Sequence, residues 1–349
     1  MEQNIIFYQM FEAESSTYTY ILADKISKEA AIIDSVLESV DRDLKLIAEL
    51  GLNLLYVLDT HIHADHITGA GKIREQTNAK TAISAAAGIS CVDMALEDGQ
   101  ELLLGNKKIK VIATPGHTDT CLSYYFEGMV FTGDSLLIRS CGRTDFQQGS
   151  ADKLYDSIRL KLFTLPSETV VYPGHDYARQ TSSTIALEKQ FNPRLSEART
   201  KVEFKKTMSE LKLDKPHKMH EAVPANLNCG IIKELYISQS RVVGGIPEVA
   251  CEEVCRNIGK VRLIDVRRSD EFNSELGHIP GAELMTLGSE LTSFLKKTDK
   301  STEIVFICRS GGRSAAATSE SIKMGYQHVI NMAGGMLRWN ELNQPIERN

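Results

Sequence analysis

Four apolar runs in the first half of the chain each end at a side chain that can bind a metal ion. The runs are LLYVLDT before His61, KIKVIATPG before His117, GMVFTG before Asp134 and TVVYPG before His175. Short apolar runs bounded by Gly, Pro and Asp predict buried strands. Because loops at the edge of a sheet commonly carry reactive side chains, this repeated placement predicts one sheet edge where the four residues converge.

The stretch DTHIHADHITG, residues 59–69, adds His63, Asp65 and His66 to the same predicted edge. Imidazole and carboxylate donors without cysteine differ from the usual structural zinc sites and favour a catalytic metal with open positions. These seven residues allow one ion with supporting neighbours, or two zinc ions that share them. For the remaining histidines we expect surface or packing roles: His217, His220, His278 and His328.

The length of 349 residues predicts two domains. Strand and helix patterns alternate to about residue 195, and LKLDKPHKMHEAVPANLNCG then combines two prolines with no clear period. Beyond this segment, VRLIDVR, EIVFIC and HVINM are strand patterns that alternate with helical ones, which indicates a small, mostly parallel α/β sheet. We therefore predict domains at residues 1–235 and 236–349.

The net charge of -6 provides no broad basic surface, so we expect no nucleic-acid or membrane partner. The N-terminal residues lack the pattern of a secretory signal, and no apolar stretch approaches the length of a membrane span. These features predict a cytoplasmic protein. Seven scattered cysteines, an odd number, favour thiols over disulfides.

The sequence VFICRSGGRSAAATSESI places a cysteine between an apolar strand and an Ala-rich helix. Successive amides at a helix N-terminus form an anion cradle, and nearby arginines favour the thiolate form of the cysteine. A phosphatase loop would need five residues between Cys and Arg, whereas four are present here. The pattern predicts a catalytic loop, with two glycines for a tight turn: Cys308, Arg309, Ser310, Gly311, Gly312 and Arg313.

The first half resembles the persulfide dioxygenases, the ethylmalonic encephalopathy protein family of the metallo-β-lactamase superfamily. The resemblance rests on THIHADHITG, TPGHTDTC, FTGDSLLIRSCGRTDFQQG, YPGHDY, NPRL and AVPANLNCG. It implies an αββα sandwich and one Fe(II) per chain, bound by His61, His117 and Asp134. It further implies supporting roles around the iron for His63, Asp65, His66, His175 and Tyr177.

Arg143 and Tyr177, which both follow Asp134 in the sequence, are candidates for contact with substrate or for packing. Arg143 has the chemistry to bind a carboxylate of a peptide-like substrate such as glutathione, and a structural ion pair is its alternative role. Tyr177 follows His175 closely enough to direct its hydroxyl into the site, with core packing as the alternative. For Cys141 we expect the role of a small buried residue.

The second half resembles a rhodanese domain through LIDVRRSDEF, GHIPGA, CRSGGRS and GGMLRW, in that order. The resemblance implies transfer of a sulfane sulfur through a persulfide on Cys308. For Asp265 and Arg267 we expect a structural ion pair at the end of a strand.

The two resemblances together imply a bifunctional enzyme of sulfur metabolism. Its iron domain is expected to oxidise glutathione persulfide with O2 to sulfite and glutathione. Its rhodanese domain is expected to exchange sulfur between thiosulfate, glutathione persulfide and sulfite, and a homodimer is the candidate assembly. The alternatives are a binuclear thioester hydrolase of the glyoxalase II kind, and a rhodanese module that only carries sulfur or regulates.

Overall fold

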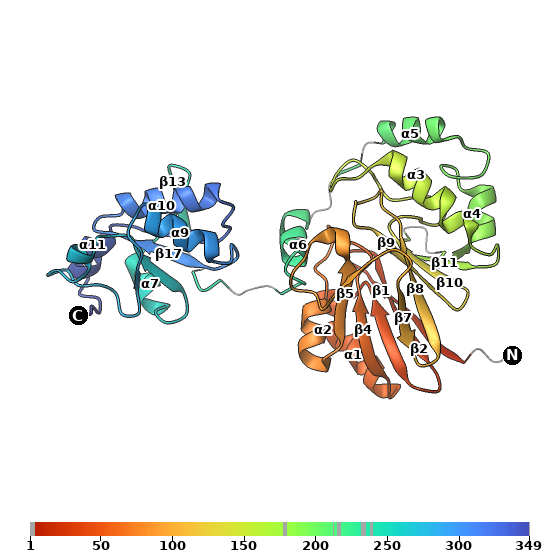
Figure 1. Cartoon of the computed structure of the whole chain (residues 1–349), viewed down its shortest axis with the longest axis horizontal. Coiled ribbons are helices and arrows are strands. Elements are labelled where there is room, and N and C mark those ends of the chain that lie inside the picture. Colours follow the sequence, from red (N-terminus) through yellow and green to blue (C-terminus); the bar gives the residue numbers. More distant parts are fainter. Residues whose placement is uncertain are drawn as a thin grey trace. The chain divides into compact units, whose positions relative to one another are not determined.

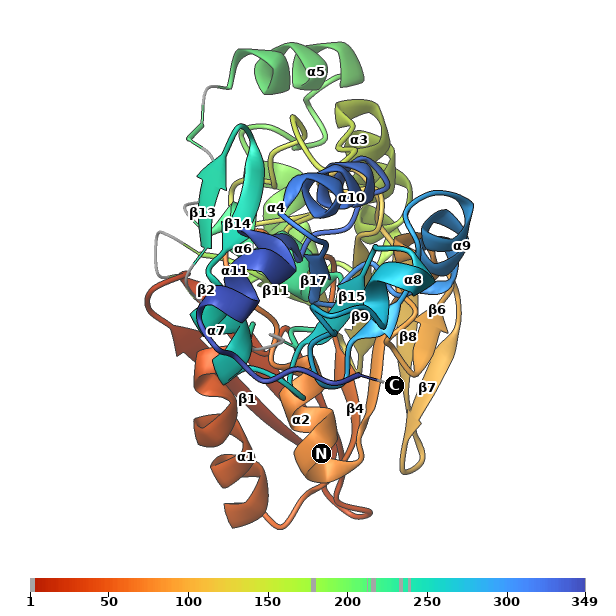
Figure 2. The same ribbon diagram turned by 90° about the vertical axis from the view of Figure 1, so that its left-hand side faces the viewer.

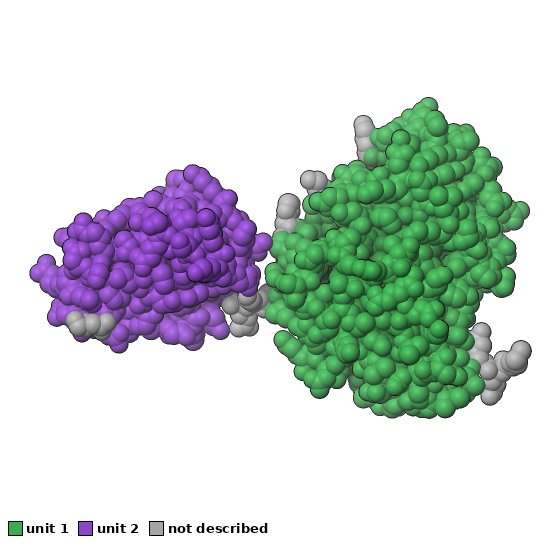
Figure 3. Space-filling view, in the orientation of Figure 1, with its two compact units in different colours: residues 1–232 green, residues 233–349 purple. Residues whose placement is uncertain are grey.

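The computed structural model describes residues 4–176, 180–211, 213–214, 218–231, 235–237 and 240–348, with only the backbone described at residue 220. The chain divides into two compact units, residues 1–232 and 233–349 (Figure 3). The predicted boundary, after residue 235, lies three residues further along the chain.

The first sheet of unit 1 has the strand order β1-β2-β3-β4-β5-β6. Strands β1 to β3 pair antiparallel, and β3 to β6 pair parallel. The strands are β1 (Ile5–Glu12), β2 (Thr17–Asp24), β3 (Glu29–Ile33), β4 (Asn53–Leu58), β5 (Lys80–Ser84) and β6 (Met94–Leu96).

The second sheet has the order β12-β11-β10-β9-β8-β7 and is antiparallel except between β10 and β11. The strand patterns that end at His117, Asp134 and His175 form three of its strands. The strands are β7 (Glu101–Leu104), β8 (Lys107–Ala113), β9 (Leu122–Phe126), β10 (Met129–Gly133), β11 (Val170–Pro173) and β12 (Ser183–Thr184).

Helices cover the outer faces of the two sheets (Figure 1 and Figure 2). The alternation along β2 shows the layering, because Tyr20 packs between the sheets whereas Ile21 packs against α1 and α2. Burying one such side chain contributes about 1.5–3 kcal/mol. On the second sheet, Val130 and Val171 pack against α3 and α5. Unit 1 is therefore the predicted αββα sandwich.

The helices of unit 1 are short, and they lie between and after the strands along the chain. The α-helices are α1 (Val40–Glu49), α2 (Ala70–Thr77), α3 (Ala151–Leu160), α4 (Ile185–Phe191), α5 (Lys201–Glu210) and α6 (Met219–Asn226). Three single 3-10 turns are also present: η1 (Leu37–Ser39), η2 (Ala85–Ala87) and η3 (Leu162–Thr164).

Unit 2 has one sheet, ordered β13-β14-β18-β17-β15-β16, which is parallel except between β13 and β14. This confirms the predicted mostly parallel sheet. Alternate residues of β17 pack on opposite faces, with Val305 and Ile307 in one core and Ile304 and Phe306 in the other. The strands are β13 (Ser240–Val243), β14 (Ile246–Val249), β15 (Arg262–Asp265), β16 (Glu283–Leu284), β17 (Ile304–Ile307) and β18 (Val329–Met332).

Helices follow the strands of unit 2 in alternation. They are α7 (Cys251–Arg256), α8 (Ser269–Phe272), α9 (Ser289–Lys297), α10 (Gly312–Lys323) and α11 (Gly335–Glu341). Among the described residues of the chain, no helix has the length and apolar character needed to cross a membrane.

One pair of cysteines departs from the sequence prediction. The structure joins Cys91 to Cys229 by a disulfide, so the expectation of thiols throughout was wrong for this pair. The two cysteines are 138 positions apart in the sequence. They come close together only because α6 packs beside α2. The other cysteines are free: Cys121, Cys141, Cys251, Cys255 and Cys308.

Candidate functional site

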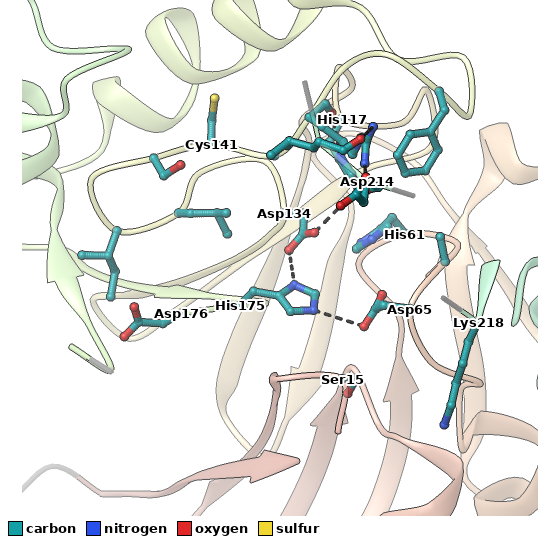
Figure 4. Close-up of a pocket in the computed structure, with 18 of the residues that line it drawn as sticks. Ser15, His61, Asp65, His117, Asp134, Cys141, His175, Asp176, Asp214 and Lys218 are labelled. Carbon is teal, nitrogen blue, oxygen red and sulfur yellow. Dashed lines mark hydrogen bonds and ion pairs between the residues drawn. The ribbon is translucent and has the colours of Figure 1, made fainter. Parts of the chain in front are cut away.

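The ends of β4, β8 and β10 bring His61, His117 and Asp134 together. Each residue offers one donor atom, and the three donor atoms lie within 4.8 Å of one another. Nε2 of His117 lies 3.7 Å from Oδ2 of Asp134. All three side chains line a cavity of about 750 Å³ (Figure 4). Two imidazoles and one carboxylate on one wall form a donor set suited to a divalent transition metal with open positions.

A hydroxyl group fixes the orientation of His61. Oγ1 of Thr60 lies 2.9 Å from Oδ2 of Asp34 and 2.9 Å from Nδ1 of His61. The hydroxyl carries one proton, which it donates to the carboxylate, so it accepts the proton on Nδ1 of His61. This tautomer leaves the lone pair on Nε2 free for a metal. No sequence motif marks Asp34, which directly follows β3 and contacts both Thr60 and His63.

A backbone carbonyl orients His117 in the same way. Nδ1 of His117 donates to the carbonyl oxygen of Arg143 at 2.8 Å, which leaves Nε2 for a ligand. The guanidinium of Arg143 binds both carboxylate oxygens of Asp145 at 2.6 and 2.7 Å, and the carbonyl of Asp214 at 2.6 Å. Arg143 therefore makes the ion pair that was its alternative role, and substrate binding by this residue stays a prediction.

His175 lies between two carboxylates (Figure 4). Its Nδ1 lies 2.7 Å from Oδ1 of Asp134, and its Nε2 lies 3.1 Å from Oδ2 of Asp65. Burial opposes the charge, but the adjacent carboxylates of Asp134 and Asp65 raise the pKa of His175 well above its usual range. Each ring nitrogen of His175 thus has a carboxylate partner in this arrangement, and its supporting role beside a metal stays a prediction.

A second group of donors is formed by His63, Asp65 and His66, whose donor atoms also lie within 4.8 Å of one another. Nε2 of His63 faces Asp34 at 3.2 Å, and Nδ1 of His66 faces Asp65 at 2.9 Å. Nδ1 of His63 and Nε2 of His66 are buried and have no hydrogen-bond partner among the described residues. Because unpaired buried nitrogens are costly, this group is also suited to hold a cation.

The cavity wall contains basic residues that the sequence analysis did not assign. Arg194 and Lys218 line the cavity, with Nη1 of Arg194 bonded to the carbonyl of Cys141 at 3.1 Å. Arg194 belongs to the NPRL motif, which had contributed only to the resemblance. Lys218 lies in the segment after residue 211 that has no clear helix or strand period, and no sequence motif marks it as a site residue. Cys141 is buried, and burial raises the pKa of its thiol to about 11.

Two predicted residues of this region lie outside the described part of the chain, Tyr177 and His217. The proposed position of Tyr177 beside the metal centre stays a prediction.

Cys308 follows β17 and its sulfur accepts hydrogen bonds from the loop at the start of α10. The amide of Gly311 donates to Sγ at 3.1 Å, and the hydroxyl of Ser314 donates at 3.2 Å. Burial acts to raise the pKa of the thiol, but these donors and the amides of Ser310 and Ser314 hold it below its usual value. Gly311 has φ +99°, a conformation that favours glycine.

The arginines of this loop have different surroundings. Arg313 donates two hydrogen bonds to the carboxylate of Glu271 at 2.7 and 2.6 Å, and these bonds lower the pKa of Glu271 to about 2. Arg309 is exposed, as are Ser310 and Gly312. The hydroxyl and amide donors at Cys308 therefore stabilise the thiolate directly, whereas the charge of Arg313 is shared with Glu271.

The predicted structural pair of Asp265 and Arg267 is fully buried. Nε of Arg267 lies 2.9 Å from Oδ1 of Asp265, and Nη2 lies 2.7 Å from Oδ2. The guanidinium also donates to the carbonyls of Glu271 and Gly277, so it connects β15 to α8 and to the GHIPGA turn.

Comparison with known proteins assigns both units. The metallo-beta-lactamase superfamily matches residues 14–91 and 92–175, and the rhodanese-like domain matches residues 251–342. "Persulfide dioxygenase ETHE1, mitochondrial" of Bos taurus is 48% identical over 230 residues, which cover 65% of this chain and 89% of the relative. The chain belongs to the persulfide dioxygenase family. This membership supports persulfide oxidation and a bound metal, and the chain adds a rhodanese module.

Solved structures agree with the family. The crystal structure of ETHE1 from Myxococcus xanthus is 51% identical with a TM-score of 0.63, and covers 65% of this chain and 100% of that chain. A metallo-beta-lactamase from Staphylococcus aureus has a TM-score of 0.61 at 20% identity and covers 95% of this chain and 99% of that chain, which shows a shared fold alone. These comparisons confirm both resemblances that the sequence motifs indicated, to the persulfide dioxygenases and to the rhodanese domain.

Proposed function

We propose that unit 1 oxidises a small persulfide, glutathione persulfide in the first instance, with dioxygen. The balanced reaction is RSSH + O2 + H2O → RSH + sulfite + 2 H+, in which the outer sulfur is oxidised and both oxygen atoms of dioxygen are reduced. We assign one Fe(II) per chain to His61, His117 and Asp134. The observation that carries this proposal is that three donors lie together on one cavity wall while His175 is held by carboxylates.

The donor set fits the ion. Nδ1 of His61 and Nδ1 of His117 are each engaged by an oxygen, so each ring presents Nε2 to the same point. Fe(II) bound on one face by two histidines and a carboxylate would supply adjacent positions for sulfur and dioxygen. Such oxygen acceptors on the remote nitrogen orient the ring and raise its basicity as a ligand.

The surrounding residues prepare the site for a thiolate substrate. His175 keeps Asp134 ionised and fixes its orientation, and Asp65 holds His175 from the opposite side. Leu137, Ile138 and Phe146 contribute apolar wall, which limits the access of water to the reacting sulfur.

We assign the carboxylates of a glutathione moiety to the basic part of the wall, Arg194 and Lys218, with Arg143 beside them. The Arg143 guanidinium would bind substrate while it keeps Asp145 as a neighbour. We place the hydroxyl of Tyr177 near the substrate sulfur, in keeping with its position directly after the YPGHD turn.

For unit 2 we propose sulfur transfer through Cys308. Its thiolate attacks the outer sulfur of thiosulfate, the S–S bond of thiosulfate breaks, and sulfite leaves with the bonding electrons. The persulfide on Cys308 then gives its outer sulfur to the thiolate of glutathione, which regenerates the Cys308 thiolate. We assign the remaining loop residues to binding the anionic donor and persulfide: Arg309, Ser310, Gly311, Gly312 and Arg313.

Each unit then forms what the other consumes. Sulfite from unit 1 accepts sulfur from a persulfide to give thiosulfate, and the reverse transfer gives the persulfide that unit 1 oxidises. We propose a cytoplasmic setting for this exchange and a homodimer as the assembly.

The experiment that tests the function of unit 1 is elemental analysis of protein purified without oxygen, combined with oxygen uptake. We expect one iron per chain, and one sulfite formed for each dioxygen consumed with glutathione persulfide. Two zinc ions per chain, with hydrolysis of lactoylglutathione and no oxygen uptake, would contradict the proposal.

One observation favours a second candidate, the binuclear hydrolase. Nδ1 of His63 and Nε2 of His66 have no hydrogen-bond partner among the described residues, so they would be available to a second ion beside the first. The stoichiometry above separates the candidates. For unit 2, Cys308→Ser should abolish thiosulfate sulfurtransfer and leave oxygen uptake intact, whereas transfer that survives would overturn the assignment of Cys308 as the sulfur carrier.

A further inference from the structure

Asn226, the last residue of α6, binds the loop that carries the metal-binding motif. Its Nδ2 donates to the carbonyl oxygens of His63 at 2.9 Å and His66 at 2.8 Å. Its Oδ1 accepts the amide of Thr68 at 2.8 Å. The side chain is 5% exposed, so these bonds form in a dry environment where each is costly to lose. One amide group thus fixes three backbone positions of the loop.

The turn after Asn226 packs on the same loop without space for a larger side chain. A Cβ atom at Gly230 would lie 1.9 Å from the carbonyl oxygen of Thr68, and Gly230 has φ +71°. The amide of Gly71 donates to the carbonyl of Cys229 at 2.9 Å. The turn therefore contacts the end of the metal-binding loop at Thr68 and the start of α2 at Gly71. The chain passes directly from the loop into this helix.

The disulfide connects this turn to the far side of α2. Cys229 is buried in the turn, whereas Cys91 is partly exposed in the segment between β5 and β6. Arg74, on α2, donates to the carbonyl of Cys91 at 2.5 Å and lies 3.8 Å from Asp93. The segments that bear the two cysteines thus hold α2 at Gly71 and at Arg74, and the disulfide joins these two attachments.

We propose that Asn226 is a positioning residue for the metal-binding loop and that the Cys91–Cys229 disulfide keeps it in place, so that reduction by thiols loosens the loop and the metal. The inference rests on the proposed metal centre at His61, His117 and Asp134. Among the described residues, neither the two cysteines nor the turn after Asn226 lines the cavity that contains His61, His117 and Asp134. Their effect passes through the backbone at His63 and His66.

The chemistry of the switch needs only a thiol as reductant. A thiolate attacks Sγ of Cys91, the more exposed sulfur, and the Cys229 thiolate leaves as the disulfide bond breaks. A second thiolate then attacks the mixed disulfide and releases the Cys91 thiolate. Two thiols are oxidised to one disulfide while the protein disulfide gains two electrons. The proposed reaction of unit 1 releases a thiol. The loop would therefore respond to the class of compound that the site itself forms.

The first test is amide hydrogen exchange of the full chain with and without dithiothreitol. We expect reduction to speed exchange roughly tenfold or more at the amides of Thr68 and Gly71, because these donate to Asn226 and Cys229. The exchange of β17 in unit 2 serves as the internal reference. Unchanged exchange at Thr68 and Gly71 after complete reduction of the disulfide would overturn the inference.

The second test is the rate at which a chelator removes metal from the loaded chain. We expect Asn226→Ala and Cys91→Ser to lose metal roughly 10–100-fold faster than the wild type. Asn226→Asp keeps an acceptor for Thr68 but removes both donors, so it should protect Thr68 and still lose metal quickly. Such a split would not follow from a general loss of folding.

Matched controls lie nearby in the sequence. Asn228→Ala removes an amide of the same turn, which donates to the carbonyl of Pro224 at 3.2 Å, and Cys255→Ser removes a free cysteine of unit 2. Both should behave as the wild type, and Cys91→Ser should no longer respond to dithiothreitol. Metal release that ignores both the reductant and Asn226→Asp would overturn the inference. If oxygen uptake is absent but dithiothreitol still changes the rate of metal release, only the proposed function is contradicted.

Discussion

Nδ1 of His175 lies 2.7 Å from Oδ1 of Asp134, a candidate metal ligand that also faces Nε2 of His117 at 3.7 Å. His175 follows a strand in the same way as His61 and His117 do, so the sequence places it in the same class. Both nitrogens of its ring, however, lie within hydrogen-bond distance of carboxylates, those of Asp134 and Asp65. A residue that has the sequence pattern of a ligand therefore contacts another candidate ligand in the structure, Asp134.

Replacing His175 by Gln should weaken metal binding roughly 10–100-fold without changing the number of ions per chain, because the side chain orients Asp134 instead of binding metal. Titration of metal into the stripped protein, with elemental analysis of the saturated form, measures both quantities. His117→Gln is the contrasting variant and should leave the site without bound iron. Loss of one of two ions in the His175 variant would show that His175 is a ligand.

Thr60→Val should lower metal affinity about tenfold and destabilise unit 1 by about 1–3 kcal/mol. The change removes the hydroxyl between Asp34 and His61, so Oδ2 of Asp34 loses a donor and His61 loses the acceptor that sets its tautomer. Denaturant unfolding and metal titration check the two effects. Thr164→Val, at the exposed last residue of η3, should alter neither. An unchanged affinity in Thr60→Val would mean that the hydroxyl does not orient His61.

Ser314→Ala should move the alkylation of Cys308 to higher pH. Ser314 is the hydroxyl donor to the sulfur, and with the loop amides it outweighs the effect of burial and holds the pKa of Cys308 below the ordinary value of 9.0. The thiolate is therefore present below pH 9 in the wild type and becomes scarcer there when the donor is lost. The rate of iodoacetamide labelling against pH, followed by mass spectrometry, measures this shift.

The same labelling experiment contains its own reference. Burial raises the pKa of Cys251 to about 11, so Cys251 should remain unlabelled over the range in which Cys308 reacts. Identical profiles for Cys308 in the wild type and in Ser314→Ala would contradict the role of the hydroxyl.

Arg267→Ala should destabilise unit 2 by about 3–5 kcal/mol, because it leaves the carboxylate of Asp265 buried without its partner. The neighbouring Arg268→Ala removes an exposed arginine that pairs with Asp270, and should leave the stability almost unchanged because water screens this pair. Thermal unfolding of the full chain, with the loss of sulfurtransfer as the signal for unit 2, compares the two. Equal stability of the variants would refute the structural assignment.

The fold followed from local patterns to a large extent. Strands such as β4 and β10 alternate or run apolar over a length typical of buried strands, and each stops where a polar side chain begins. The order of strand and helix patterns after residue 240 predicted the parallel sheet of unit 2. Two features had no local signal, the disulfide between Cys91 and Cys229 and the basic side chains of Arg194 and Lys218 in the cavity wall.

The sequence by itself determined which chemistry is present, because residue type and spacing are local properties. The strand ends at His61, His117 and Asp134 supply donors for a metal, and the Cys308 loop supplies a sulfur nucleophile at a helix N-terminus. Tertiary structure alone decided which nitrogen of each histidine is free, since those protons are placed by distant partners such as Asp34 and the Arg143 carbonyl. Hydrogen-bond direction depends on neighbours in space, which the order of residues along the chain does not specify.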